Sequence, residues 1–269
     1  MLKLKKLIKG GEKVSKIALI TGASSGIGKA TAEILAKNGY NVIVSARRLE
    51  RLIEIQKQLE KKYKVEVLPL RLDVRDKDAV EDYLTNLPDG WKEIDVLVNN
   101  AGLSKGLEKL QDGKIENWEV MIDTNIKGLL YVTRAILPSM VKRNSGTIVN
   151  IASIAGHETY PGGNVYCATK AAVLHLSKAL RKDLVGTNIR VVSIDPGMVE
   201  TEFSIVRFDG DKEKAAKVYE GITPLTAEDV AEAVWFAISR PPHVTVEDMV
   251  LMPTQQASVL LTVKNYKRI

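Results

Sequence analysis

A tyrosine and a lysine stand four positions apart in the segment NVYCATKAAV, as Tyr166 and Lys170. In a helix this spacing places both side chains on one face, about one turn apart. A tyrosine hydroxyl, with an ordinary pKa of about 10, is a poor acid–base group at neutral pH. A nearby ammonium favours the phenolate and lowers that pKa. The pair therefore suits an acid–base site, although the same spacing is common by chance.

Two further polar residues are candidates for the same site. Ser153 ends the apolar run NIAS, and its hydroxyl could bind a substrate oxygen and stabilise charge developing there. The alternative is a serine that caps a turn. Asn125 lies within an expected helix, in DTNIKG, and faces the expected sheet. A buried asparagine must be hydrogen-bonded, either by holding water or backbone next to Lys170 or by ordinary core contacts.

A glycine-rich segment, TGASSGIG, lies between an expected strand and an expected helix. Glycines allow a tight turn and a close approach of the backbone to a pyrophosphate, and the helix N-terminus offers unpaired N–H groups. The alternative is a turn that only lets strand and helix pack. We predict dinucleotide binding here by Gly22, Ser24, Ser25, Gly26, Ile27 and Gly28.

The residues after the second expected strand indicate which dinucleotide is bound. An acidic residue about 20 positions beyond the glycines would bind the ribose 2′-hydroxyl of NAD. This chain has Ala46 there, followed by Arg47 and Arg48. Paired guanidinium groups bind a 2′-phosphate by charge-assisted hydrogen bonds, so NADP is favoured over NAD. The alternative is an exposed basic start to the next helix.

Two other strand ends are candidates for the cofactor site. Asp73 and Val74 close the third expected strand, and Asp73 could instead cap the helix that follows, as could Asp76. Asn100, Ala101 and Gly102 close the fourth, where a small Ala-Gly pair leaves room for a ribose or a flat ring. A purely structural turn is the alternative.

Short apolar runs alternate with helical patterns from Lys16 onward, and this order predicts the fold. Continuous apolar strands are typical of a parallel sheet covered on both faces by helices. The expected class is α/β, a doubly wound sheet in one domain over residues 16–269, after a basic extension over 1–15. The expected strands are Ile17–Thr21, Asn41–Ala46, Val65–Leu72, Ile94–Asn99, Gly146–Ser153, Ile189–Ile194 and Met249–Met252, with long helices over Asn117–Arg143 and Gly163–Val185. Pro196–Thr223 is expected to be irregular, a mobile substrate loop.

Composition excludes several other classes of protein. The 269 residues are 45% hydrophobic and 27% charged, and no run of 18 apolar residues could span a membrane. The single cysteine, with three histidines, supports neither a disulfide nor a zinc site and favours a reducing compartment, hence the cytoplasm. The net charge of +6 arises from 39 basic and 33 acidic residues spread along the chain, so no nucleic-acid partner is expected.

Together these segments resemble the short-chain dehydrogenase/reductase family. TGASSGIG, NNAG, DTNIKG, Ser153, YCATK and DPGMVET occur in that family's order and cover nearly all of residues 16–252. The resemblance implies a seven-stranded Rossmann-type sheet and a catalytic set of Asn125, Ser153, Tyr166 and Lys170. It also implies that Lys170 binds the nicotinamide ribose, and it adds Pro196, Gly197, Val199 and Thr201 to the cofactor site.

A narrower resemblance extends to the substrate loop. SARRLERL, TEFSIVRFDGD and LMPTQQAS resemble the branch of NADP-dependent 3-hydroxy acid dehydrogenases. That branch oxidises serine and L-allo-threonine, acts on small 3-oxo acids, and forms homotetramers. The alternatives are a 3-oxoacyl-thioester reductase of the same family or a non-catalytic NADP-binding regulator. HETY, before the catalytic tyrosine, and the first 13 residues depart from the branch.

One basic residue lies in an otherwise apolar part of the expected substrate loop, Arg207 in SIVRF. A small 3-hydroxy acid carries a carboxylate, which a water-excluding site must neutralise. A guanidinium fork suits a carboxylate better than an ammonium does. We therefore expect Arg207 to bind the substrate together with Ser153 and Tyr166, the alternative being a solvated or structural arginine.

Overall fold

A computed structural model of the protein describes residues 15–265. The predicted basic extension over residues 1–15, with its lysine run, therefore lies almost entirely outside the described residues.

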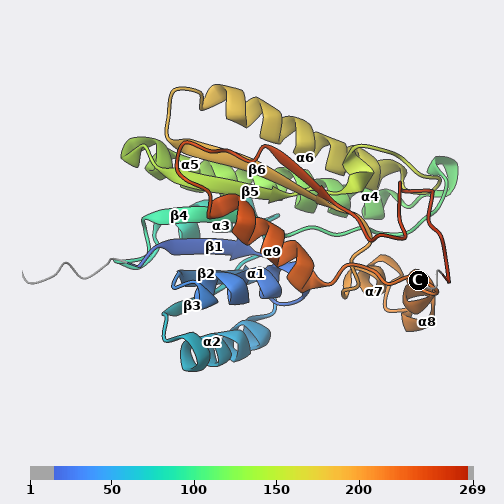
Figure 1. The fold of residues 1–269 in the computed structure, drawn as a ribbon, viewed down its shortest axis with the longest axis horizontal. Coiled ribbons are helices and arrows are strands. Elements are labelled where there is room, and N and C mark those ends of the chain that lie inside the picture. The colour runs from blue at the N-terminus through green and yellow to red at the C-terminus, as the bar shows by residue number, and fades with distance from the viewer. Residues whose placement is uncertain (1–14, 266–269) are drawn as a thin grey trace, which may run out of the picture.

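Seven parallel strands form one sheet in the order β3-β2-β1-β4-β5-β6-β7, which confirms the predicted doubly wound α/β class (Figure 1). The central strands are buried on both faces, as their continuous apolar runs predict. The strands are β1 Ile17–Thr21, β2 Asn41–Ala46, β3 Val67–Arg71, β4 Ile94–Asn99, β5 Gly146–Ile151, β6 Ile189–Pro196 and β7 Asp248–Leu251.

Helices cover both faces of the sheet. Helices α1, α2 and α9 share one buried cluster with the sheet, and α3, α5 and the end of α6 share the cluster on the opposite face. Their bounds are α1 Gly26–Lys37, α2 Leu49–Tyr63, α3 Lys77–Thr85, α4 Ile115–Ile122, α5 Leu129–Arg143, α6 Asn164–Asp183, α7 Phe203–Arg207, α8 Lys212–Lys217 and α9 Ala227–Ile238; short turns η1 Leu110–Asp112 and η3 Ile154–Gly156 complete the set.

The register of the strands brings their carboxyl ends to one edge of the sheet. Thr21 at the end of β1 pairs with Ser45 of β2, and Asn99 at the end of β4 pairs with Asn150 of β5. Because all seven strands run in the same direction, the loops that leave these ends are neighbours. The candidate site residues of the glycine loop, the NNAG turn and Ser153 are therefore gathered at this edge.

The prediction of one helix over Asn117–Arg143 is wrong in its middle. A π-helical segment, η2 Asp123–Gly128, separates α4 from α5. The widened turn contains Asn125, whose side chain bonds the backbone of Leu103, and Gly128, where a Cβ would lie 2.6 Å from a methyl carbon of Val74. Such π-segments recur at functional sites, because they re-aim side chains that a regular helix would direct elsewhere.

The prediction that Pro196–Thr223 is irregular is also wrong in part. This stretch contains α7 and α8, which contact one another at one end of the molecule (Figure 1). Asp211 caps α8, and the Tyr219 hydroxyl donates to the Val199 carbonyl at 2.9 Å while bonding the Ser204 hydroxyl at 2.7 Å. Hydrogen bonds between residues 15 and 20 positions apart in the sequence hold this segment in place, and helical periodicity does not reveal them.

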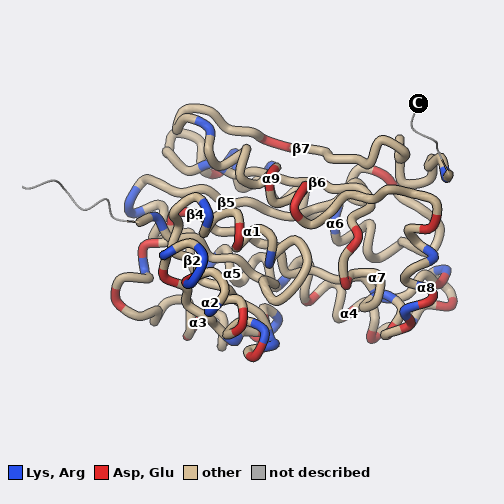
Figure 2. Tube along the Cα trace, turned by 60° about the horizontal axis from the view of Figure 1, so that its bottom comes forward, with Lys and Arg blue, Asp and Glu red and all other residues tan. Residues whose placement is uncertain are grey.

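Basic and acidic residues are interspersed along the trace in the view of Figure 2. No helix within residues 15–265 is long and apolar enough to cross a membrane. Nor does this part of the chain hold a cluster of three or more His, Cys, Asp or Glu side chains suited to a metal ion.

The centre of the sheet predicts a stability effect. Leu97 in β4 is 0% exposed and pairs with Leu19 and Ile148 on the neighbouring strands. Leu97→Ala should lower the free energy of unfolding by roughly 2–5 kcal/mol, because it removes buried methyl groups and leaves a cavity. Urea denaturation followed by circular dichroism measures this.

Val185→Ala is the matched control, since Val185 is 84% exposed and its truncation should change stability by less than about 0.5 kcal/mol. Equal losses in the two variants would contradict the assignment of the core.

Candidate active site

A cleft at the carboxyl edge of the sheet gathers almost all of the predicted site residues. It is lined by Gly22, Ser24, Ser25, Gly26, Ile27, Arg47, Arg48, Asp73, Val74, Asn100, Ala101, Gly102, Ser153, Tyr166, Lys170, Pro196, Gly197, Val199 and Thr201. Three predicted residues, Gly28, Asn125 and Arg207, do not line it. The residues come from segments far apart in the sequence, and the sheet brings them together.

The glycine loop leaves no room for a side chain at Gly22 and Gly28. A Cβ on Gly28 would lie 2.4 Å from Nδ2 of Asn100 and 2.6 Å from the Gly22 carbonyl oxygen. Gly28 therefore packs against the NNAG turn and does not line the cleft. Asn100 Nδ2 donates to the Thr21 carbonyl at 2.8 Å, so the NNAG turn is fastened to the end of β1. Gly22 has φ +67°, a conformation that favours glycine.

Arginines gather at one end of the cleft. Nη2 of Arg48 donates to the hydroxyls of Ser24 and Ser25 at 2.9 Å each, and its Nη1 forms an ion pair with Glu202 at 2.9 Å. Arg51 pairs with the other oxygen of Glu202 at 2.7 Å. The predicted Arg48 is thus placed beside the glycine loop, and Arg47 lines the same end of the cleft.

Asp73 belongs to the cleft and does not cap α3. That helix is capped by Asp76, whose Oδ1 accepts from the Ala79 amide. Asp73 pairs with Arg75 at 2.6 Å, and the pKa of its carboxyl is lowered mainly by the hydrogen bond from that guanidinium. Arg75 therefore adds a third arginine to this end of the cleft.

Ser153, Tyr166 and Lys170 meet at the other end of the cleft. Ser153 caps η3 by accepting from the Ala155 amide at 3.1 Å, so the capping and site interpretations of this residue hold together. Lys170 is 6% exposed, and its Nζ donates to the Ile151 carbonyl at 2.8 Å. The same Nζ lies 6.0 Å from the centre of the Tyr166 ring. The helix spacing thus places both side chains at the end of β5.

Burial governs the protonation of this pair. It raises the pKa of Tyr166 above its ordinary value, while Arg207 and the Ser153 hydroxyl act in the opposite direction. The charge of Lys170 is not among the causes of this shift, since its ammonium is itself buried and donates to the Ile151 carbonyl. Burial lowers the pKa of Lys170 to about 8, opposed by the charge of Asp195.

Asn125 lies behind the cleft, 2% exposed, as the prediction of a buried asparagine expects. Its Oδ1 accepts from the Leu103 amide at 2.9 Å, and its Nδ2 donates to the Leu103 carbonyl and the Thr169 hydroxyl. A Cβ on Gly102 would lie 3.3 Å from Oδ1 of Asn125 and 3.5 Å from Nζ of Lys170. Asn125 therefore holds the chain that passes directly beside Lys170.

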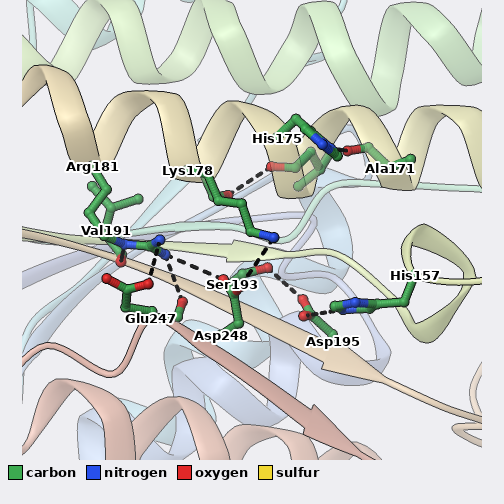
Figure 3. Close-up of polar contacts among 12 residues, drawn as sticks. His157, Ala171, His175, Lys178, Arg181, Val191, Ser193, Asp195, Glu247 and Asp248 are labelled. Atoms are coloured by element: carbon green, nitrogen blue, oxygen red, sulfur yellow. Dashed lines mark hydrogen bonds and ion pairs between the residues drawn. The ribbon is translucent and has the colours of Figure 1, made fainter.

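A second polar network surrounds Asp195 of β6 (Figure 3). Asp195 is 0% exposed, accepts from the Ser193 hydroxyl and pairs with Nε2 of His157 at 2.8 Å. Burial raises the pKa of Asp195, and these two partners oppose that shift. Along the same edge, Lys178 and Arg181 of α6 pair with Asp248 (Figure 3).

Arg207 lies next to the acid–base pair although it does not line the cleft. Its guanidinium carbon is 5.3 Å from the centre of the Tyr166 ring and 5.1 Å from that of Phe203. Nε donates to the Ser104 hydroxyl at 3.1 Å, and Nη2 donates to the Tyr160 hydroxyl at 2.7 Å. The arginine is thus held at one wall of the cleft.

Several residues of the cleft are not predicted from the sequence, among them Arg75, Leu103, Thr124, Glu202, Phe203 and Val206. Arg75 carried a usable signal, a basic residue two positions after a strand-end aspartate. Glu202 carried none, since its partners Arg48 and Arg51 lie more than 150 positions away in the sequence.

The chemistry of these groups fits a phosphorylated dinucleotide. Three arginines and two serine hydroxyls at one end suit phosphate oxygens, and the first turn of α1 presents amide N–H groups there. The buried Thr124 hydroxyl, which lines the cleft, has no hydrogen-bond partner within residues 15–265. Val74, Ala101 and Ile151 supply apolar walls for flat rings.

The fold and this site define a class of protein, and comparison with known proteins identifies it. The family model described as short chain dehydrogenase matches residues 16–212. The chain belongs to the short-chain dehydrogenase/reductase family.

Individual relatives are also similar over most of their length. The "NADP-dependent 3-hydroxy acid dehydrogenase YdfG" of Salmonella typhi is 51% identical, covering 92% of this chain and 98% of the relative. The "NADP-dependent 3-hydroxy acid dehydrogenase" of Schizosaccharomyces pombe is 49% identical, covering 90% of this chain and 93% of the relative. The solved structure "The Closed form of serine dehydrogenase complexed with NADP+" has a TM-score of 0.86 and 47% identity, over 94% of this chain and 100% of that one.

The burial of Lys170 predicts a pH dependence of stability. Its pKa is about 8 in the folded chain and ordinarily 10.5, so between these values the unfolded chain binds more protons and stability rises with pH. Lys170→Met removes this titration. The free energy of unfolding of the variant, relative to that of the original protein, should therefore be highest near pH 7 and fall as pH rises from 8 to 10.5.

Urea denaturation at a series of pH values measures that difference. Lys178→Met serves as control, because the Lys178 side chain on the same helix is 46% exposed and its difference should vary little. A Lys170 difference that stays constant with pH would show that the ammonium is solvated.

Proposed function

We propose that the protein is an NADP-dependent oxidoreductase acting on the CH-OH group of a small 3-hydroxy acid. The observation that carries this proposal is the meeting of Ser153, Tyr166 and Lys170 in a cleft whose other end holds three arginines. The names of the relatives, NADP-dependent 3-hydroxy acid dehydrogenase and serine dehydrogenase with NADP+, support it. Residues 16–269 then form one catalytic domain.

Each residue of the site has a role in this proposal. NADP+, when held by the glycine loop and the arginine end of the cleft, would supply the hydride acceptor for oxidation of the carbon that bears the hydroxyl. Tyr166 takes the hydroxyl proton as the phenolate, the form that the charge of Arg207 and the nearby charge of Lys170 favour against its burial, and Ser153 donates a hydrogen bond to the substrate oxygen. Lys170 supplies positive charge beside Tyr166 and binds the ribose, and Asn125 holds the backbone next to it.

The two ends of the cleft divide the binding of the cofactor. Arg47, Arg48 and Arg75 would neutralise the 2′-phosphate, and the glycine loop would hold the pyrophosphate. Asp73 and Val74 would contact the adenine, Asn100–Gly102 the ribose, and Pro196–Thr201 the nicotinamide, since all these segments contribute to the lining of the cleft. NADP rather than NAD follows from the charge of the arginine end.

One assay tests the proposed function directly. Purified protein with NADP+ is offered serine, L-allo-threonine, 3-hydroxypropionate and 3-hydroxybutyrate, and NADPH is followed by its absorbance. Reduction of NADP+ by at least one of these acids is expected. No activity with any of these acids, together with NADPH-dependent reduction of a long-chain 3-oxoacyl thioester, would contradict the proposal. The substrate would then be a thioester and not a small acid.

Quaternary structure and location complete the proposal. Exposed apolar side chains such as Leu260 and Leu261, 68% and 62% exposed, favour assembly, and the branch that the chain resembles suggests a homotetramer. The only cysteine of the chain, Cys167, is buried and free, which suits the cytoplasm. Light scattering of the purified protein measures the number of subunits.

Tyr166 gives the first functional prediction. Tyr166→Phe should lower kcat by at least about a hundredfold, because it removes the acid–base group, while the Kd for NADP+ stays unchanged. Steady-state kinetics and fluorescence titration of the cofactor measure the two quantities. Tyr83→Phe is the control and should keep full turnover, because the Tyr83 side chain is exposed on α3. Full turnover of the Tyr166 variant would remove this residue from the mechanism.

Arg47 gives the second, since it lines the arginine end but, unlike Arg48, does not hydrogen-bond the glycine loop. Arg47→Ala should raise the Kd for NADP+ roughly ten- to a hundredfold, from loss of charge-assisted bonds worth about 1.5–3 kcal/mol. The Kd for NAD+ should barely change. Lys57→Ala, exposed on α2, should alter neither. An equal rise in Kd for both cofactors would show that Arg47 is a surface residue that does not bind the 2′-phosphate.

A further inference from the structure

Arg207 is a half-buried cation for which no anionic partner is present nearby. Within residues 15–265 no carboxylate oxygen lies within 4 Å of its guanidinium. Its neighbours are instead the rings of Tyr160, Tyr166 and Phe203, with centres 5.1–5.8 Å from the guanidinium carbon. Aromatic faces attract a cation, but they replace only part of its hydration. The positive charge of Arg207 is therefore balanced by no carboxylate within residues 15–265, which leaves it able to pair with an anion that enters the site.

Two neutral hydroxyls hold the guanidinium in a fixed orientation. Nε donates to Ser104, which is 1% exposed, and Nη2 donates to the oxygen of Tyr160. Each hydroxyl accepts in these bonds, so the Tyr160 hydrogen is free to donate elsewhere. Nη1 makes no hydrogen bond within the described residues. The terminal nitrogens and the Tyr160 hydroxyl thus form a cluster of available donors.

The backbone around Arg207 reinforces this arrangement. The amide of Gly106 donates to the Arg207 carbonyl at 3.1 Å, and Lys105 pairs with Asp209. Helix α7 is thereby fastened to the Leu103–Gly106 segment, whose start is held by Asn125. A guanidinium that is oriented before its ligand arrives loses little freedom on binding.

We propose that Arg207 and Tyr160 form a carboxylate-binding subsite, with Ser104 as a positioning residue, that selects acids over uncharged alcohols. The proposal rests on the proposed function. It fits the shape of a 3-hydroxy acid, in which the carboxylate stands two carbons from the reacting carbon. With the hydroxyl at Tyr166, the acid extends toward the wall formed by Phe203 and Val206 of α7, the helix that ends at Arg207. The guanidinium fork then binds both carboxylate oxygens.

Turnover of an acid and of its uncharged isostere tests the subsite. The substrates are 3-hydroxybutyrate and 3-hydroxybutyramide, which differ chiefly in the negative charge. Arg207→Met should raise KM for the acid at least tenfold and leave KM for the amide within about threefold. Arg207→Lys, which keeps the charge but not the fork, should lie between the two. Tyr160→Phe should raise KM for the acid by a smaller factor.

Binding to the NADPH-loaded enzyme is measured in parallel by calorimetry, because an alcohol and the reduced cofactor do not react. The original protein should bind the acid more tightly than the amide, and Arg207→Met should abolish that preference. Thermal unfolding verifies that each variant is folded, and Ile205→Ala, in α7 but outside the cleft lining, controls for disturbance of the helix.

The outcomes separate the subsite from the function. Absence of turnover, with the acid still bound in preference to the amide, would overturn the proposed reaction and keep the subsite. Equal changes for acid and amide in Arg207→Met and Arg207→Lys would make Arg207 a structural tie between α7 and Leu103–Gly106. No preference for the acid in the original protein would overturn the subsite altogether.

Discussion

Burial of both faces of a parallel sheet is the constraint on which the rest of this structure depends. Strands such as β1, β4 and β5 are buried along almost their whole length, so a substrate cannot reach the side chains within the layers. The carboxyl edge is where backbone groups leave the ladder and side chains can gather. The site is consequently assembled from the loops and helix turns at this edge, and each loop must be fixed individually. Asn100 fastens one of them to β1, and Asn125 fastens another through Leu103.

The free-energy cost of burying charge determines the protonation of groups at the end of the cleft that holds Ser153, Tyr166 and Lys170. Lys170 and Asp195 are both nearly inaccessible, and each has its pKa displaced by burial toward the neutral form. Their mutual field opposes this displacement for Lys170. Desolvated groups of this kind respond strongly to any charge placed beside them, since little water screens the interaction. A cofactor or substrate that brings charge into the cleft therefore acts on an electrostatic balance that the fold has already prepared.

Glu202 connects the two ends of the cleft. It pairs with Arg48 and Arg51 at the arginine end and immediately precedes Phe203, the first residue of α7. Arg48 in turn bonds Ser24 and Ser25 of the glycine loop. The side chains are partly exposed, so each pair contributes little to stability. Their significance is geometric, because one run of contacts joins the phosphate-binding loop to the helix that carries Arg207.

The sequence by itself determined the elements and the motifs, because these depend on near neighbours. Apolar runs fixed the strands, glycine spacing fixed the turn after β1, and the Tyr166–Lys170 spacing fixed a shared helix face. The missing acid at Ala46 followed by Arg47 and Arg48 indicated the cofactor. Only the tertiary structure decided the π-segment at Asn125, the raised pKa of Tyr166, and the partners of Arg207 and Glu202. These depend on residues brought together from 22 to more than 150 positions apart, and on burial by several elements at once, which no local pattern records.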